Sequence, residues 1–138
     1  MTIHVAPLRI EDHARWIVLA RGYKTFYKTT LEDTEYDKAW QRLLAQEDVF
    51  GLGATRDGQL LGIAHYLFHT SVWAQNVCYL QDLFVDPLAR GQGVARALIE
   101  AISQDFEGTR RHALLLAHAG TKRERSCVVR QGGEVQWV

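Results

Sequence analysis

The stretch from Cys78 to Ile102 constrains the fold of this chain most, because patterns typical of a strand, a turn and a helix follow one another directly. Cys78–Val85 is rich in apolar and aromatic residues, as a mostly buried strand is, and Pro87 ends it because proline has no N–H to donate. A turn at Arg90–Ala95 contains two glycines. Apolar residues then recur at helical spacing, at Val94, Ala97, Leu98, Ala101 and Ile102. The sequence therefore predicts a strand, a tight loop and an amphipathic helix over residues 91–106.

The loop between this strand and helix has the properties of an anion-binding site. Gly91 and Gly93 lack side chains, so the N–H groups of the first helical turn can approach an anion, and their dipoles favour negative charge there. Arg90 and Arg96 add cationic donors. The spacing is not that of a Rossmann loop, and the Gly-Lys-Ser/Thr of a P-loop is absent. On local geometry alone, such a turn serves equally well as a simple connection.

Length and composition predict one soluble domain over residues 1–138. With 138 residues, of which 47% are hydrophobic, the chain can bury one real core. No run approaches the length of a membrane span, and the N-terminus has neither a basic start nor an apolar signal core, so a cytoplasmic location is expected. Two cysteines are too few for a disulfide framework, and the six histidines form no convincing metal-ligand grouping.

The formal net charge of zero conceals an asymmetry along the chain. Through Gly108 there are 10 Lys and Arg against 14 Asp and Glu, whereas from Thr109 onward there are 6 against 2. A basic segment is compatible with nucleic-acid contact, but this one lacks interleaved aromatic residues and any recognition motif. We therefore expect no nucleic-acid partner.

The predicted order of elements is β-α-α-β-β-β-α-β, which indicates a mixed α/β sheet in a single domain. Asp57-Gly58 joins two strands and supplies the positive backbone angles of a tight hairpin. The remaining elements are a strand that begins at Ile3–Val5, helices at Glu11–Tyr27 and Thr34–Ala45, strands at Val49–Arg56 and Gln59–Phe68, and a strand at Ala113–Ala117.

After the strand, Val85-Asp86-Pro87 leads into Arg90-x-x-Gly93-x-Ala95. Together with the predicted order of elements, this motif resembles the GCN5-related N-acetyltransferases (GNAT), whose central motif is Arg/Gln-x-x-Gly-x-Gly/Ala. Within this superfamily Tyr79–Val85 looks most like the spermidine/spermine acetyltransferases and related diamine or amino-acid acetyltransferases. The resemblance implies the GNAT fold, acetyl-CoA as the only cofactor, a small-molecule amine as acceptor and a homodimer.

The resemblance also assigns the cofactor site. The N–H groups from Gln92 to Arg96 are expected to hold the pyrophosphate of coenzyme A, and the main chain at Leu83, Phe84 and Val85 is expected to lie along its pantetheine arm. The side chains of these strand residues are expected to pack in the core. The predicted cofactor-binding residues are Leu83, Phe84, Val85, Arg90, Gly91, Gln92, Gly93, Val94, Ala95 and Arg96.

Proton transfer is less clearly specified. An acceptor amine that resembles lysine is protonated at neutral pH, since its reference pKa is about 10.4, so a proton must leave before or during attack. In the polyamine acetyltransferases a glutamate assigned as the base usually precedes the strand's aspartate. Here that residue is Gln81, a candidate catalytic residue that can orient a water or a substrate but cannot take up a proton. Asp82 is therefore the first candidate base, directly or through water. A solvated or structural carboxylate is the alternative.

Residues around the first two helices are candidates for the acceptor site. The acidic cluster of Glu32, Asp33, Glu35 and Asp37 can attract a cationic amine, although acidic residues also simply favour a helix N-terminus. Tyr23, Phe26, Tyr27 and Tyr36 can line an acceptor pocket or belong to the core. Of these, Tyr23, Tyr27, Glu32 and Asp33 are the predicted substrate residues.

The tail from about residue 109 departs from the family. The usual Trp-x-Thr, asparagine and A-L-Y-D-K-V-A helix are missing, as is the tyrosine expected to protonate the departing thiolate. When allowed codons for Cys127–Gly133 are read one nucleotide later they can encode A-L-Y-D-K-V-A, and Leu116–Lys122 can yield W-L-T-Q-E-Q-N. We therefore hypothesise that the tail from near Arg110 results from a frameshift, which nucleotide sequencing tests. With this tail, the alternative function is a catalytically weak or inactive acyl-CoA-binding protein.

Overall fold

The computed structural model describes residues 2–70, 72, 77–108, 113–116, 127–130 and 134–137. Its strands form one sheet in the order in which they occur in the sequence, with parallel pairing only between β4 and β5. The strands are β1 (His4–Pro7), β2 (Val49–Arg56), β3 (Gln59–His69), β4 (Val77–Val85), β5 (Ala113–Leu116), β6 (Cys127–Arg130) and β7 (Glu134–Trp137).

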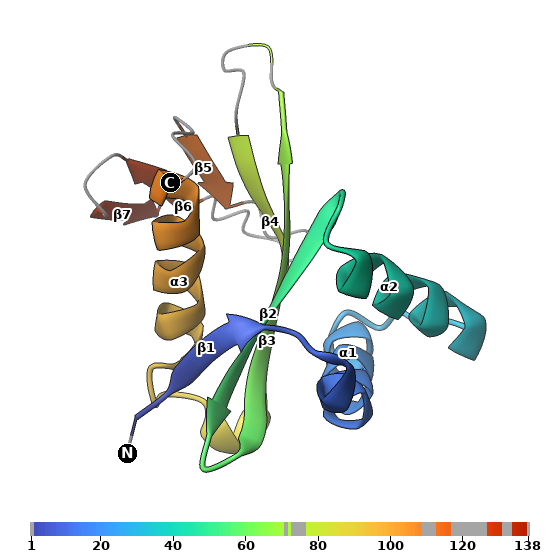
Figure 1. Cartoon of the computed structure of the whole chain (residues 1–138). Helices are drawn as coiled ribbons and strands as arrows, with labels where there is room; N and C mark the ends of the chain where they lie inside the picture. Colours follow the sequence, from blue (N-terminus) through green and yellow to red (C-terminus); the bar gives the residue numbers. More distant parts are fainter. Residues whose placement is uncertain are drawn as a thin grey trace.

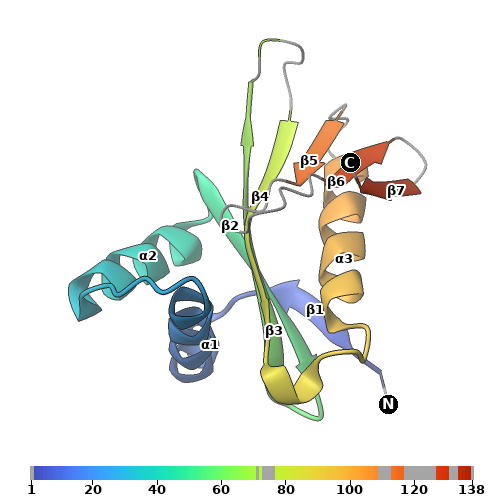
Figure 2. The same ribbon diagram turned by 180° about the vertical axis from the view of Figure 1, so that it is seen from behind.

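Helices cover both faces of the sheet. The helix α1 (His13–Phe26), which follows a short 3-10 turn η1 (Ile10–Asp12), and α2 (Asp33–Ala45) lie on one face, and α3 (Val94–Gly108) lies on the other (Figures 1 and 2). A second 3-10 turn, η2 (Pro87–Ala89), connects β4 to the loop before α3. The predicted mixed α/β class and the predicted succession of elements through β5 are confirmed. The structure adds β6 and β7, which the predicted order omitted.

The hairpin between β2 and β3 turns as the sequence predicts. Asp57 and Gly58 both have positive φ angles, of 52° and 76°, which match the twist of the flanking strands. The side chains of the atypical tail lie outside the described residues. Among the described helices, none combines the length and the hydropathy of a bilayer span.

Two apolar cores lie on opposite faces of the sheet. On the α3 face, Cys78 and Leu80 of β4 pack with Val94, Leu98 and Ile102 of α3. The approach of α3 is close, since a Cβ atom on Gly62 would lie 2.7 Å from Val94 Cγ1. The core of the opposite face contains residues of α1, α2 and the sheet, among them Trp16, Leu19, Tyr23, Trp40, Ile63 and Phe84. These two cores fix the strand β4 between the helices that surround the candidate site.

A β-bulge in β4 sets the direction of two polar side chains. His65 of β3 pairs with Asp82, but the next residue, Tyr66, pairs with Leu80, so Gln81 is an extra residue in β4. In a regular strand, consecutive side chains point to opposite faces. Because of the bulge, Gln81 and Asp82 both line the cavity on the α1 and α2 face.

Candidate active site

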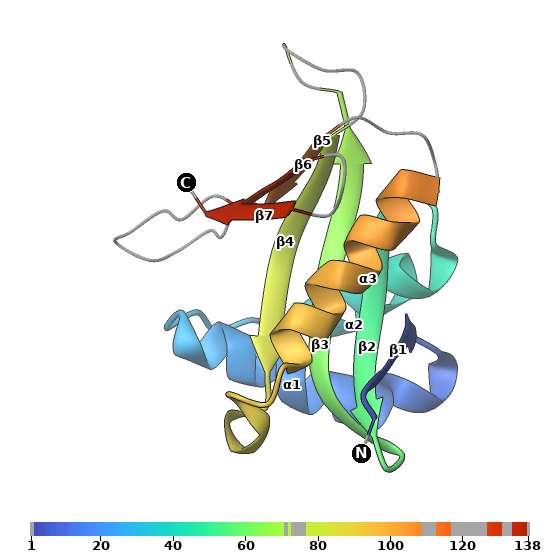
Figure 3. The same ribbon diagram turned by 90° about the vertical axis from the view of Figure 1, so that its left-hand side faces the viewer.

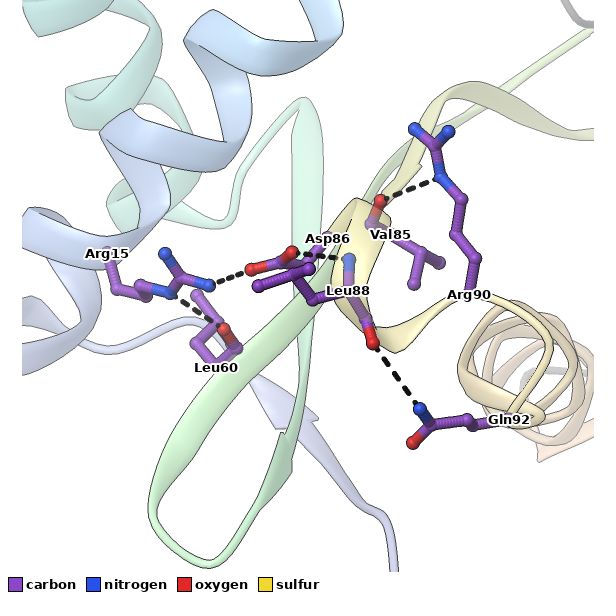
Figure 4. A network of polar contacts seen from close by, with 7 residues as sticks. All are labelled: Arg15, Leu60, Val85, Asp86, Leu88, Arg90 and Gln92. Carbon is purple, nitrogen blue, oxygen red and sulfur yellow. Dashed lines mark hydrogen bonds and ion pairs between the residues drawn. The ribbon is translucent and has the colours of Figure 1, made fainter.

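Asp86, directly after β4, ties the loop before α3 to the helix α1. Its Oδ1 accepts a hydrogen bond from the Leu88 N–H at 2.9 Å, and its Oδ2 pairs with the guanidinium of Arg15, whose Nε donates to the Leu60 carbonyl at 3.0 Å (Figure 4). The backbone hydrogen bond from Leu88, and then the Arg15 partner, outweigh partial burial and lower the pKa of Asp86. The carboxylate therefore fixes the start of the loop as well as the position of α1.

Side chains of the loop itself also hold its conformation. Arg90 Nε donates to the Val85 carbonyl at 3.3 Å, and its guanidinium lies 5.5 Å from the centre of the Phe84 ring. Gln92 Nε2 donates to the Leu88 carbonyl at 3.4 Å, and Gln92 Oε1 accepts from Arg56 Nη1 at 2.6 Å. The two contacts of Arg90 hold it against the end of β4 (Figure 4). Gln92 connects the loop to the β2–β3 hairpin through Arg56.

The loop presents main-chain N–H groups in an open concave turn. Gly91 and Gly93 have φ angles of 77° and 85°, and no other atom lies within 4 Å of the position that a Cβ would occupy on either glycine. The Ala97 N–H donates to the Gly93 carbonyl at 3.0 Å, which is the first i to i−4 hydrogen bond of α3. The N–H groups of Val94, Ala95 and Arg96 come before this bond, in the first turn of the helix, where N–H groups have no partner of this kind. This arrangement fits an anion such as a pyrophosphate. The Arg96 side chain, in contrast, pairs with Glu100 at 2.9 Å.

The strand β4 has a long edge that β5 does not cover. Within the described part of the chain, β5 pairs only with Val77–Tyr79, so the rest of that edge has no strand partner (Figure 3). Leu83 and Val85 pack half-buried against the α3 core, and Phe84 is buried on the other face. These side chains pack as the sequence predicts, while the role of their main chain toward the pantetheine arm stays a prediction.

The α1–α2 cavity, of about 370 Å³, lies between these helices and strands β2, β3 and β4. Its wall combines aromatic and aliphatic side chains with cations from both helices and carboxylates from α2 and β4. The lining residues are Trp16, Ala20, Tyr23, Lys24, Leu31, Glu35, Tyr36, Ala39, Arg42, Leu43, Val49, Ile63, His65, Gln81, Asp82 and Phe84.

The α1–β4 cavity, also of about 370 Å³, adjoins the first one. It is lined by Tyr23, Lys24, Tyr27, Thr29, Tyr79, Gln81 and Asp82. Tyr23, Lys24, Gln81 and Asp82 line both cavities, so they stand where the two spaces meet. The structure thus brings the predicted catalytic pair, Gln81 and Asp82, together with the predicted substrate residues Tyr23 and Tyr27.

Asp82 is held as a carboxylate by two hydrogen-bond donors. Its Oδ2 lies 2.9 Å from Nδ1 of His65, and the hydroxyl of Tyr23 also hydrogen-bonds to it. Burial raises the pKa of Asp82, but the hydrogen bonds from His65 and Tyr23 and the charge of Lys24 outweigh it, so the pKa is lowered. Burial and the neighbouring Asp82 charge raise the pKa of Tyr23, which therefore stays protonated. Asp82 is consequently negative, and only weakly basic, at neutral pH.

Trp16 and His65 extend this hydrogen-bond chain and were not among the predicted site residues. The indole Nε1 of Trp16 lies 3.0 Å from Nε2 of His65, and the Trp16 side chain is only 1% exposed. Lys24 and Arg42 of the cavity wall were also missed. The sequence contains no signal for His65, because its pairing with Asp82 depends on the register of β3 against β4 and on the bulge.

The predicted acidic substrate residues lie away from both cavities. Glu32 precedes α2 as its N-cap residue, and Asp33 is exposed and pairs with Arg21 at 2.6 Å. Glu35, from the same acidic cluster, does line the α1–α2 cavity. The role of Glu32 and Asp33 in substrate binding stays a prediction. In the described part of the chain, no group of three or more His, Cys, Asp or Glu side chains is placed to hold a metal ion.

The mixed sheet, the glycine loop before α3 and the bulge of β4 define the GNAT class of acyltransferase folds, and comparison with known proteins agrees. Residues 16–132 match the sequence profile described as the Acetyltransferase (GNAT) family. The chain belongs to this family.

A D-amino-acid N-acetyltransferase of Saccharomyces cerevisiae, HPA3, is 33% identical over 104 residues, which make up 72% of this chain. The chain spans 65% of the length of that yeast protein.

Solved structures of similar fold include two bacterial or archaeal acetyltransferases. A ribosomal-protein-alanine N-acetyltransferase from Brucella melitensis biovar Abortus 2308 is similar with a TM-score of 0.74 and 23% identity, over 88% of this chain and 84% of that one. The PaiA N-acetyltransferase from Thermoplasma acidophilum, solved in complex with coenzyme A, is similar with a TM-score of 0.63 and 22% identity, over 85% and 79% of the two chains. At these identities the likeness concerns the fold.

Proposed function

We propose that this protein transfers an acetyl group from acetyl-CoA to a primary amine of a small molecule by direct attack, without a covalent enzyme intermediate. The observation that carries the proposal is the anionic carboxylate of Asp82, which stands at the junction of the α1–α2 and α1–β4 cavities. A buried anion held by two donors is a suitable partner for the ammonium group of an acceptor.

The loop before α3 supports acetyl-CoA as the donor. Its open turn at Gly91 and Gly93 and the N–H groups of Val94, Ala95 and Arg96 fit the pyrophosphate. The edge of β4 that β5 leaves uncovered offers main-chain groups to the amides of a pantetheine arm. When bound, acetyl-CoA supplies an activated thioester. The bond from the amine nitrogen to the acetyl carbon forms, and the bond from that carbon to sulfur breaks.

In this proposal Asp82 binds and orients the acceptor amine, but it does not accept the proton that the ammonium form must lose before attack. The reference pKa values of an alkyl amine and an aspartate differ by about 6.5, and the pKa of Asp82 lies below the ordinary value, so this proton transfer is strongly uphill. The proton of the ammonium therefore passes to solvent, and the small free-amine fraction attacks. Gln81, on the same side of β4, orients the amine or a water without taking up a proton.

The charges of the α1–α2 cavity favour an amino acid over a polyamine as the acceptor. Asp82 provides an anion for the amine, whereas Arg42 and Lys24 provide cations in the same wall. The other carboxylate of this wall, Glu35, pairs with Lys38 at 3.4 Å. Arg42 is exposed and makes no ion pair or hydrogen bond among the described residues, so its guanidinium is available to a carboxylate. A second ammonium group would be repelled at that position. The yeast relative named as a D-amino-acid N-acetyltransferase agrees with this choice.

The alternative function is an acyl-CoA-binding protein with weak or no activity, because the tail lacks the family's tyrosine. A thiol of pKa about 8.5 is a tolerable leaving group without a dedicated acid, so we expect reduced turnover rather than none. Part of the proposal is a homodimer, which light scattering tests.

Calorimetry with acetyl-CoA and a thiol-release assay separate the two functions. The acceptor panel pairs D- and L-amino acids with their decarboxylated amines and includes polyamines. Turnover highest on the amino acids supports the proposal. Binding of acetyl-CoA without turnover on any amine supports the alternative, and absence of binding contradicts both.

A further inference from the structure

A chain of hydrogen bonds crosses from the core of α1 to the candidate ammonium-binding carboxylate. Trp16 Nε1 lies 3.0 Å from His65 Nε2, and His65 Nδ1 lies 2.9 Å from Asp82 Oδ2. Trp16 is fully buried, and the side chains of His65 and Asp82 are 14% and 19% exposed. The three residues come from α1, β3 and β4, so only the folded sheet with its packed helix assembles them.

The chemistry of these groups determines which nitrogen of His65 carries a proton. An indole N–H is a donor only, so Nε2 of His65 must present a lone pair to Trp16. The ring is then neutral, its proton is on Nδ1, and Nδ1–H donates to Asp82. Protonation at Nε2 would place two N–H groups against each other. It would also deprive a buried indole N–H of its acceptor, which is costly.

We propose that Trp16 is a positioning residue that fixes His65 as the neutral Nδ1–H tautomer, so that Asp82 keeps its full negative charge for the acceptor amine. The assignment of this charge to amine binding rests on the proposed function. His65 is accordingly not the catalytic base, although an imidazole beside a carboxylate is the arrangement that usually suggests one.

Other charged groups face the same space and enter the charge balance. The groups around His65 in the cavity wall are Tyr23 and Lys24 from α1, Glu35, Tyr36 and Arg42 from α2, and Asp82 from β4, while His13 stacks on the far side of Trp16. Of these groups, Lys24 and Arg42 carry positive charge, and Glu35 and Asp82 carry negative charge. A protonated His65 would make the wall positive and would cancel the charge of Asp82, to the disadvantage of an incoming ammonium.

Nitrogen NMR of the histidine rings tests the tautomer directly. In the wild type, we expect the His65 ring, assigned by its loss in His65→Gln, to show a protonated Nδ1 and an unprotonated Nε2. In Trp16→Phe no N–H donor faces Nε2, so this nitrogen is free to carry a proton. Its signal should then shift toward that of a protonated nitrogen.

The matched control is Trp40→Phe. The Trp40 ring lies 4.9 Å from that of Trp16 and is also buried, so this variant removes an indole from the same aromatic cluster but leaves the bond from Trp16 to His65 in place. We expect the ring-nitrogen signals of His65 in Trp40→Phe to match those of the wild type. If Trp16→Phe fails to fold, the wild-type spectrum alone still decides the tautomer.

Kinetics give a second readout. The acceptor KM of Trp16→Phe should be at least fivefold higher than that of the wild type, because a proton on Nε2 of His65 would offset the charge of Asp82. A glutamine can accept from Trp16 and donate to Asp82 but cannot titrate. The kcat/KM of His65→Gln should therefore be at least tenfold higher than that of His65→Ala.

A wild-type His65 that carries its proton on Nε2 overturns the inference. So do unchanged His65 nitrogen signals in Trp16→Phe, or an equal loss of kcat/KM in His65→Gln and His65→Ala. Failure of the proposed acetyl transfer is recognised separately, since the spectra do not depend on turnover.

Discussion

Arg15 of α1 and Asp86 at the end of β4 form an ion pair that connects the helix lining the α1–α2 cavity with the loop before α3. The same carboxylate accepts from the Leu88 N–H, and the same guanidinium donates to the Leu60 carbonyl. One pair of side chains thereby fixes the relative position of the candidate acceptor site and the candidate coenzyme A loop. Proper alignment of two substrates contributes strongly to the rate of a transfer reaction.

Substitutions of Asp86 separate the ion pair from the turn. Asp86→Ala removes both, and we expect it to lower the free energy of unfolding by about 1–2 kcal/mol, the usual cost of a lost cap. Asp86→Asn keeps an acceptor for the Leu88 N–H and should cost roughly half as much. The pKa of Asp86 is lowered in the fold, so its contribution is present above about pH 3.9 and is lost as the pH falls through the folded-state pKa.

Chemical denaturation of the wild type and Asp86→Asn at a series of pH values checks the direction of this pH dependence. The stability difference between them should be full at pH 7 and should shrink below about pH 3.9. A difference that stays constant down to pH 2.5 would contradict the role of the charge.

Gly93→Ala tests the loop. Its φ angle of 85° makes a side chain there strained, at a cost of about 1–2 kcal/mol, although no atom stands in the way of the Cβ. The added methyl group would project into the space assigned to the pyrophosphate, so acetyl-CoA affinity should fall at least tenfold by calorimetry. Gly58→Ala is the matched control, because Gly58 has a φ angle of 76° and equally open space, but lies in the β2–β3 hairpin. It should lose similar stability and no affinity; equal losses of affinity in both variants would refute the assignment of the loop.

Asp82→Asn tests the ammonium partner. Loss of a hydrogen bond to a charged group typically costs about 1.5–3 kcal/mol, so kcat/KM for the amine should fall about 10- to 100-fold while acetyl-CoA affinity stays within twofold. Asp37→Asn, on the exposed side of α2 and outside both cavities, is the control for a general change in charge. A similar loss in both variants would indicate long-range steering instead of a contact with Asp82.

The pH profile reports where the amine loses its proton. Since the pKa of Asp82 is lowered, this carboxylate does not titrate near neutrality. We expect kcat/KM to rise about tenfold per pH unit up to the pKa of each amine, as the free-amine fraction does. Amines of different pKa should therefore shift the break in the profile. A break in the kcat/KM profile at the same pH for all amines would indicate a basic group of the enzyme and would contradict this mechanism.

Arg42→Gln tests the carboxylate contact. Removal of the exposed guanidinium should raise the KM for amino acids about three- to tenfold and leave that for their decarboxylated amines unchanged, in line with the modest strength of exposed charge pairs. Lys28→Gln, at an exposed position outside both cavities, controls for the loss of one positive charge. An equal effect of Arg42→Gln on both acceptor types would show that Arg42 does not recognise the carboxylate.

Much of the fold was predictable because its signals are local. The alternation and composition of Val49–Arg56, the Asp57-Gly58 turn and the spacing of apolar residues after Gly93 specify their elements through nearby residues alone. The glycine loop was predictable for the same reason. The strands β6 and β7 were not in the predicted order, because the short segments Cys127–Arg130 and Glu134–Trp137 carry little periodic signal.

The sequence by itself determined the order of the elements through β5, the loop before α3 and the presence of Gln81 and Asp82 in β4. Only the tertiary structure decided what Asp82 touches. The bulge brings it to the same cavity as Gln81, the register places it opposite His65, and the packing of α1 adds Trp16 and Tyr23. These contacts join residues far apart in the chain, so their physical cause is the pairing and packing of whole elements, which no local pattern records.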